Sequence, residues 1–191
     1  MTEAKYPYNK SEVVIRPATQ DDATLIAQVL AMALDGDGSH PLFDIFCQLS
    51  RRDDTQYSYR NTLVAEVEGS AAGAIVGYDG AKLHHLRRAL EEILRDIYGE
   101  EFILEEETSA GEFYIDSVAI LPEFRGLGIG QILISTMCND AFAAGFNKVG
   151  LLVDFDNPRA ESLYTSLGFK RVNPTTFLGH NMWHMQTEMD F

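Results

Sequence analysis

Residues 116–130 read Asp116-Ser-Val-Ala-Ile-Leu-Pro-Glu-Phe-Arg-Gly-Leu-Gly-Ile-Gly130, and this stretch decides the fold. It begins as an apolar strand, is interrupted at Pro122 and continues through a glycine-rich turn into an amphipathic helix. A strand that leads directly into a helix presents free backbone N–H groups at the positive end of the helix dipole. Glycines have no Cβ, so a phosphate can approach these N–H groups closely. The stretch therefore predicts a pyrophosphate site at the start of the helix.

The rest of the chain is predicted to supply strands and helices around this junction. Strands are expected at residues 12–17, 62–67, 72–78, 112–121, 148–154, 169–172 and 180–189, and helices at 25–34, 43–49, 83–97, 127–144 and 157–168. Residues 1–11 are polar and expected to be loose. In the helix at 83–97, leucines and isoleucines share one side, and Arg87 falls with the other charged residues on the solvent side. The acidic stretch 100–111 is predicted to be a solvated loop, with the lining of a substrate entrance as the alternative.

Length and composition fit a single domain over residues 1–191. The formal net charge of −14 argues against binding to nucleic acid or to an anionic membrane. It is compatible with attracting a cationic substrate, although solubility alone would also explain it. No run of 18 apolar residues occurs, and the N-terminus lacks the pattern of a signal peptide. With only Cys47 and Cys138, far apart in the chain, we expect a reduced, cytoplasmic protein.

Three classes of glycine-rich phosphate site compete for the junction. A P-loop is excluded because no Gly-Lys-Ser/Thr sequence occurs. A dinucleotide site would need Gly-x-Gly-x-x-Gly, whereas the spacing here is Gly126-x-Gly128-x-Gly130. Asp154, at the end of the next predicted strand, keeps that class open as an alternative.

Two motifs in the chain match a third class of phosphate site. Arg125-Gly-Leu-Gly-Ile-Gly130 matches the Arg/Gln-x-x-Gly-x-Gly/Ala signature of the GNAT superfamily of N-acetyltransferases, which this chain resembles. The second signature follows at the expected spacing, as Asn157-Pro-Arg-Ala160 and then Leu163-Tyr164 and Leu167-Gly-Phe169. The resemblance is firm over residues 112–172 and implies an α/β (α+β) fold. It also implies a mixed, mostly antiparallel sheet with helices on both faces, in which the strands at 113–121 and 148–154 start parallel and then splay.

The resemblance implies acetyl-CoA as the co-substrate, with no metal. By position, the backbone of Val118, Ala119 and Ile120 would bind the pantetheine arm. The main chain of Arg125, Gly126, Leu127, Gly128, Ile129 and Gly130 would bind the pyrophosphate. Asn157 matches a position that contacts the CoA arm, although a helix N-cap is the alternative interpretation.

The implied reaction is direct attack of a primary amine on the acetyl thioester, which needs a base, an acid and an oxyanion donor. Tyr164 matches the family's tyrosine near the cofactor sulfur and is predicted to be the general acid. For the base we expect Asp116, with Glu112, Asp154 or a chain of water molecules as alternatives. His180 and His184 are four residues apart in a predicted strand, where this spacing does not indicate a metal site.

The partners and the acceptor are less defined by the sequence. The acceptor is expected to be an amine on a small molecule or a peptide, and a homodimer through the last strands is possible within the family. A non-catalytic acyl-CoA-binding module on the same fold is the second functional hypothesis.

Overall fold

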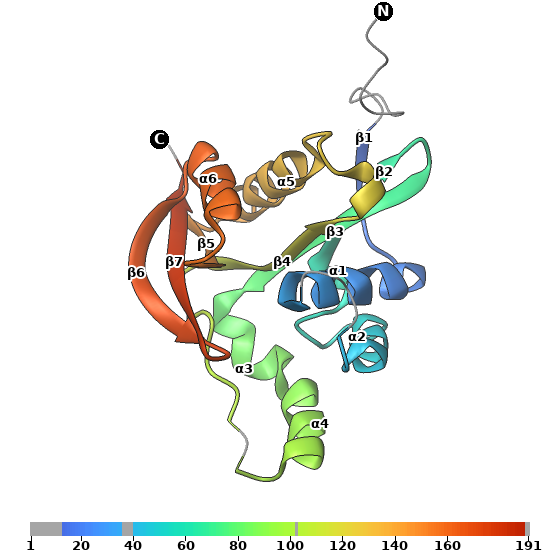
Figure 1. Cartoon of the computed structure of the whole chain (residues 1–191), viewed down its shortest axis with the longest axis vertical. Coiled ribbons are helices and arrows are strands. Elements are labelled where there is room, and N and C mark those ends of the chain that lie inside the picture. Colours follow the sequence, from blue (N-terminus) through green and yellow to red (C-terminus); the bar gives the residue numbers. More distant parts are fainter. Residues whose placement is uncertain (1–12, 36–39, 102, 190–191) are drawn as a thin grey trace, which may run out of the picture. The chain divides into compact units, whose positions relative to one another are not determined.

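Seven strands form one mixed sheet in the computed structural model, which describes residues 13–35, 40–101 and 103–189 (Figure 1). The strand order is β1-β2-β3-β4-β5-β7-β6, and β4 and β5 form the parallel pair. The strands are β1 (Val13–Pro17), β2 (Thr62–Val67), β3 (Ser70–Asp79), β4 (Phe113–Ile120), β5 (Lys148–Asp154), β6 (Lys170–Phe177) and β7 (His180–Glu188). This confirms the predicted fold class, a mixed and mostly antiparallel sheet with one parallel pair.

The helices follow the predicted order, with one difference. They are α1 (Ala23–Asp35), α2 (Phe43–Ser50), α3 (Leu83–Leu86), α4 (Arg88–Tyr98), α5 (Ile129–Ala143) and α6 (Pro158–Ser166). The single helix predicted at 83–97 is two helices, because the chain breaks at Arg87, whose side chain is buried. The predicted loose segment 1–11 and residues 36–39, between α1 and α2, lie outside the described residues.

The chain divides into two compact units. The first comprises residues 1–53, 57–76 and 117–137, and the second comprises residues 54–56, 77–116 and 138–191. β3, β4 and α5 each contribute residues to both units. The single domain over 1–191 remains a prediction, and each unit is described below by itself.

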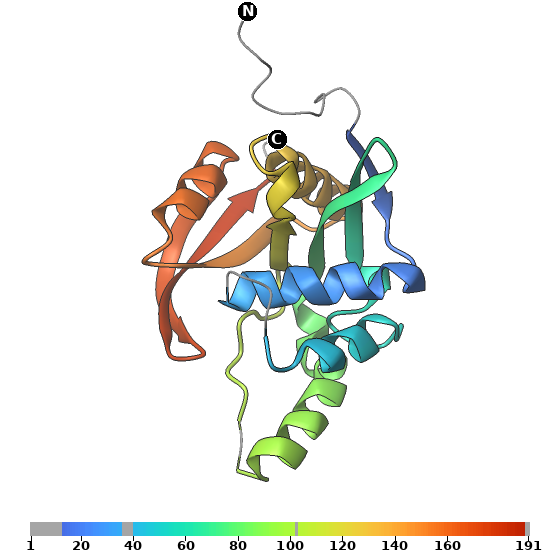
Figure 2. The same cartoon turned by 45° about the vertical axis from the view of Figure 1, so that its right-hand side comes forward.

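The core of the first unit lies between α1, α2 and the strands β2 and β3. Its fully or nearly buried members include Ile26, Val29, Leu30, Phe46, Val64, Ala74 and Val76. These residues recur at helical spacing in α1 and at alternate positions in the strands, which is the pattern that placed the elements in the sequence. Figure 2 shows α1 and α2 side by side in this unit.

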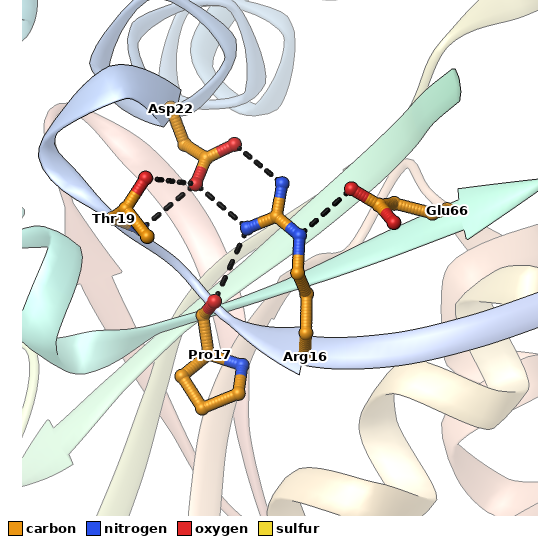
Figure 3. Close-up of polar contacts among 5 residues, drawn as sticks. All are labelled: Arg16, Pro17, Thr19, Asp22 and Glu66. Carbon is orange, nitrogen blue, oxygen red and sulfur yellow. Dashed lines mark hydrogen bonds and ion pairs between the residues drawn. The ribbon is translucent and has the colours of Figure 1, made fainter. Parts of the chain in front are cut away.

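An arginine-centred network closes the start of α1 in the first unit (Figure 3). The Arg16 guanidinium donates to both carboxylate oxygens of Asp22 at 2.8 Å, and its Nε donates to Glu66 at 2.7 Å. Asp22 also accepts from the backbone N–H and the hydroxyl of Thr19, which completes the capping box before α1. This network ties β1 to both α1 and β2.

The second unit contains the strand pairs of the C-terminal half of the sheet. β6 and β7 form a long hairpin beside β5 (Figure 1). The parallel register of β4 and β5 covers three pairs, from Phe113 with Val149 to Ile115 with Leu151. The splay predicted beyond this register remains a prediction. Leu83 and Leu86 of α3 pack on Tyr78 and Tyr114, which anchors α3 to the strands.

Candidate active site

The junction between β4 and α5 keeps its backbone accessible because its large side chains turn inward. After β4, Pro122–Phe124 form one 3-10 turn, and Phe124, Leu127 and Ile129 are buried. Gly126 and Gly128 adopt φ angles of +84° and +79°, in the left-handed region that glycine enters without steric cost. The first turn of α5 leaves N–H groups without intrahelical partners. Gly126 and Gly128 thus occupy positions that favour glycine, whereas Gly130 lies in the first turn of α5.

Three polar groups of this junction already have partners inside the first unit. The Arg125 side chain donates from Nε to the Ile120 carbonyl at 3.1 Å, and its backbone N–H donates to the Pro122 carbonyl. Leu121 donates its N–H to the Ala72 carbonyl, which joins the end of β4 to β3. The exposed part of the Arg125 guanidinium remains available to an anion.

The predicted site residues divide between the two units. Val118, Ala119, Ile120 and residues 125–130 belong to the first unit, and Asp116, Asn157 and Tyr164 belong to the second. The structure therefore brings the predicted phosphate-binding residues together in one continuous stretch. For Asp116, Asn157 and Tyr164, the structure describes the contacts within the second unit.

Asn157 and Tyr164 lie at the start and in the last turn of α6. The Asn157 side-chain oxygen accepts from the backbone N–H of Ala160 at 3.1 Å, so the N-cap interpretation is confirmed. The ring of Tyr164 lies 6.0 Å from that of Phe169. Burial raises the pKa of Tyr164 to about 12. Tyr164 is therefore a protonated hydroxyl at neutral pH and available as a proton donor.

Asp116 lies in a buried polar cluster that the sequence did not predict. Its Oδ2 is 3.2 Å from the hydroxyl of Tyr78, and the same hydroxyl lies 2.9 Å from Oε1 of Glu107. Glu107 forms an ion pair with Arg87, and the side chains of both are almost fully buried. Burial, together with Asp116 and Glu107, raises the pKa of Tyr78 well above its ordinary value. The single Tyr78 hydrogen is therefore shared between two carboxylates.

Glu112, the alternative base, is saturated with donors. Its carboxylate accepts from Thr108 Oγ1 at 2.7 Å, from Gln186 Nε2 at 2.7 Å and from His184 Nε2 at 3.0 Å. Burial opposes ionisation, but the hydrogen bonds from His184, Gln186 and Thr108 outweigh it and lower the pKa of Glu112. A buried carboxylate with three donors and a lowered pKa is a poor proton acceptor.

Several of these contacts correct the interpretation of the sequence. Arg87 was expected on the solvent side of a helix, but its side chain is 1% exposed. The acidic stretch was expected to be solvated, but Glu107 and Thr108 are buried. The pairing between Arg87 and Glu107 could not be predicted from the sequence, because neither a spacing nor a motif links them. The one signal in the sequence is Gly150, because a glycine inside an apolar strand often marks a close approach. Here the group close to it is the Glu112 carboxylate.

The remaining predicted candidates have simpler settings. Asp154 accepts from the backbone N–H of Asp156 at 2.8 Å and lies 2.9 Å from His180 Nδ1, so it is a turn residue with a histidine partner. No group of three potential metal ligands occurs among the described residues. Likewise, within residues 13–35, 40–101 and 103–189 no helix has both the length and the apolar character to cross a membrane.

Comparison with known proteins resolves the competition between phosphate-binding classes. The model of the acetyltransferase (GNAT) family matches residues 26–169, which include both motifs. The chain belongs to this family. A crystal structure of an acetyltransferase shares 33% identity with a TM-score of 0.76, covering 93% of this chain and all of that one. An N-acetyltransferase from Staphylococcus aureus Mu50 shares 25% identity with a TM-score of 0.78, over 91% of this chain and all of that one.

A curated relative gives a narrower match. A mycothiol acetyltransferase from Kocuria rhizophila is 43% identical over 61 residues, which are 32% of this chain and 20% of that protein. The chain spans between about a fifth and two thirds of the length of the curated relatives it matches. The chain is thus related to acetyltransferases, and the family to which it belongs uses acetyl-CoA as its acetyl donor.

Proposed function

We propose that the chain transfers the acetyl group of acetyl-CoA to a primary amine by direct attack within a ternary complex. The observation that carries this proposal is the junction at residues 117–130, where buried Phe124, Leu127 and Ile129 hold Gly126 and Gly128 in left-handed conformations. A helix that starts at such a turn is suited to bind phosphate through its main chain. The match to the family over residues 26–169 supports the same assignment.

In this scheme, the backbone of Val118, Ala119 and Ile120 binds the pantetheine arm, and residues 125–130 bind the pyrophosphate. The exposed Arg125 guanidinium adds charge near the phosphates. Asn157 uses its side-chain oxygen as the N-cap of α6, which leaves its amide N–H groups for the CoA arm. These roles are assigned residue by residue from the family motif.

The chemistry needs a donor for the departing thiolate and a base for the amine. Tyr164 is the proposed acid, because it matches the family's tyrosine near the cofactor sulfur and its hydroxyl is protonated at neutral pH. A backbone N–H of β4 is the proposed donor to the oxyanion. The base predicted from the sequence is Asp116, which lies beside the hydroxyl of Tyr78.

The acceptor is proposed to be an amine on a small molecule or a peptide. The net charge of −14 favours an acceptor with more than one positive charge, since such a field raises its concentration near the protein.

The proposal is tested first at the phosphate site. We expect Gly128→Ala to weaken CoA binding at least tenfold in isothermal titration calorimetry, because the new Cβ strains the turn and crowds the phosphate. Gly145→Ala is the matched control, since Gly145 also has a positive φ (+95°) but follows the opposite end of α5. Equal CoA affinity of Gly128→Ala and wild type would remove the basis of the proposal.

A thiol-release assay with acetyl-CoA and a panel of primary amines then tests catalysis. We expect Tyr164→Phe to lower kcat by about 10²-fold with unchanged CoA affinity, a typical contribution for a general acid. CoA binding without acetyl transfer to any amine would favour the second hypothesis, a non-catalytic acyl-CoA-binding module. Binding of NAD in place of CoA would favour the dinucleotide site.

A further inference from the structure

A histidine hydrogen-bonded to a buried carboxylate lies in the second unit and has no role in the scheme above. His184 of β7 contacts Oε2 of Glu112 through Nε2 at 3.0 Å. The Glu112 side chain is 4% exposed, whereas that of His184 is 18% exposed. One partner is therefore enclosed by protein, while the imidazole still reaches solvent.

The enclosure of Glu112 is built into the fold. A Cβ placed on Gly150 would lie 2.0 Å from Oε2 of Glu112, so β5 carries a glycine where the carboxylate enters the strand surface. Gln186 and Thr108 hold the same carboxylate with further hydrogen bonds at 2.7 Å. Three donors and one glycine fix the position of the group that contacts His184.

The hydrogen bond fixes which ring nitrogen of His184 carries a hydrogen. Oε2 of Glu112 also accepts from the side-chain amide of Gln186 at 2.7 Å, and the lowered pKa of Glu112 agrees with an ionised carboxylate, which only accepts hydrogen bonds. Nε2 of His184 must therefore be the donor. In the neutral imidazole, this leaves the lone pair on Nδ1, the nitrogen that does not face Glu112.

The strand register places His184 on the same face as the predicted base. His184 pairs with Leu152, and Gly150, two residues earlier on β5, pairs with Tyr114 of β4. Paired residues share a face, and so do alternate residues of one strand, so Tyr114 and Asp116 lie on the face of His184. The two groups differ in their surroundings, because the hydroxyl of Tyr78 joins Asp116 to the buried pair of Glu107 and Arg87.

We propose that His184, oriented by Glu112, accepts the proton of the acceptor amine, so that His184 is a catalytic residue and Glu112 a positioning residue. The assignment rests on the proposed function and deepens it. Nδ1 takes one proton from the ammonium group, and the freed lone pair forms the C–N bond while the C–S bond breaks. The departing thiolate gains a proton from Tyr164, the second proton lost by the nitrogen restores the Tyr164 hydroxyl, and His184 returns its proton to solvent. The net products are an amide, a thiol and one proton.

Kinetics of paired variants test the assignment, using whichever amine in the panel gives the highest kcat/KM. We expect His184→Ala to lower kcat by 10² or more with little change in the KM for acetyl-CoA, and imidazole in the buffer to restore at least a tenfold gain. Glu112→Gln should lower kcat at least tenfold, because an amide no longer fixes the tautomer. His180→Ala is the matched control on the same strand, and its kcat should stay within twofold of wild type.

A second measurement does not need an acceptor. In ¹⁵N NMR of the wild-type protein at pH 8, His184 should show a protonated Nε2 and an unprotonated Nδ1, and Glu112→Gln should change this pattern. A protonated Nδ1 would overturn the proposal. So would a large loss of kcat in Asp116→Asn together with a loss of less than twofold in His184→Ala. If no amine accepts the acetyl group, that result counts against the proposed function. The tautomer measured by NMR would then test only whether Glu112 orients His184.

Discussion

The two units each contain an arginine bound by carboxylates, but the two arginines lie in opposite environments. In the first unit, the Arg16 side chain is 32% exposed and is shared between Asp22 and Glu66. In the second unit, the side chains of Arg87 and Glu107 are 1% and 3% exposed. When one partner of a half-exposed ion pair is removed, water can still hydrate the charge that remains. In a buried pair, water cannot reach that charge. Replacing the arginine should therefore lower the stability of the protein less in the first unit than in the second.

The largest effect is expected from breaking the buried pair. Arg87→Met should lower the free energy of unfolding by about 3–5 kcal/mol, because it leaves the Glu107 carboxylate buried without its cation. Chemical denaturation measures this directly. Arg88→Met is the matched control, since Arg88 is the next residue but is exposed, and its effect should stay within about 0.5 kcal/mol. A loss below about 1 kcal/mol for Arg87→Met would mean that water reaches Glu107.

The next effect concerns the glycine that admits Glu112. Gly150→Ala should cost about 1–3 kcal/mol, because its Cβ would displace a carboxylate that holds three hydrogen bonds. Removing the carboxylate first should remove most of this cost. We therefore expect the double mutant Gly150→Ala/Glu112→Ala to be destabilised by at least about 1 kcal/mol less than the sum of the two single mutants. Additive effects would show that the added methyl group clashes with something other than Glu112.

Part of the setting of Arg16 is local in the sequence, whereas that of Arg87 is not. Thr19 and Asp22 stand three residues apart immediately before an apolar helix, which is a local signature of a capping box. The junction at residues 126–130 was equally local, because its glycines and the helix after it are adjacent in the chain. Such features can be inferred from spacing alone, and the junction was predicted in this way.

The buried clusters could not be inferred in this way. Arg87 falls at a polar position of a helical pattern, and its partner Glu107 lies in a segment without periodicity. His184 contacts a carboxylate 72 residues away, through a strand pairing that no local signal specifies. The fold therefore follows largely from local patterns. The polar chemistry of the second unit depends on long-range register, which becomes visible only once the strands are paired.

A smaller effect is expected when the half-exposed network is broken. Arg16→Met should cost about 1–2 kcal/mol, because a bidentate contact to Asp22 and one to Glu66 are replaced by water. Arg60→Met is the control, since the Arg60 side chain is 62% exposed and its nearest carboxylate contact is 3.6 Å. If Arg16→Met cost as much as Arg87→Met, burial would not be what distinguishes the two arginines.

The smallest effect is the pH dependence of the Arg16 network, and its sign follows from linkage. The hydrogen bond from Arg16 lowers the pKa of Asp22 below that of the unfolded chain. A lowered folded pKa stabilises the protein at pH values above the unfolded pKa, which is about 3.9 for aspartate, and this contribution is lost as the pH falls through the folded value. The penalty for Arg16→Met should therefore be constant from pH 7 to pH 5 and shrink below pH 4 in denaturation curves.

Added salt should reduce the penalty for Arg16→Met more than that for Arg87→Met, because salt screens exposed pairs and not buried ones. A penalty for Arg16→Met that persists unchanged at pH 3 and at 1 M salt would mean that packing of its alkyl chain, not charge, holds β1 to α1.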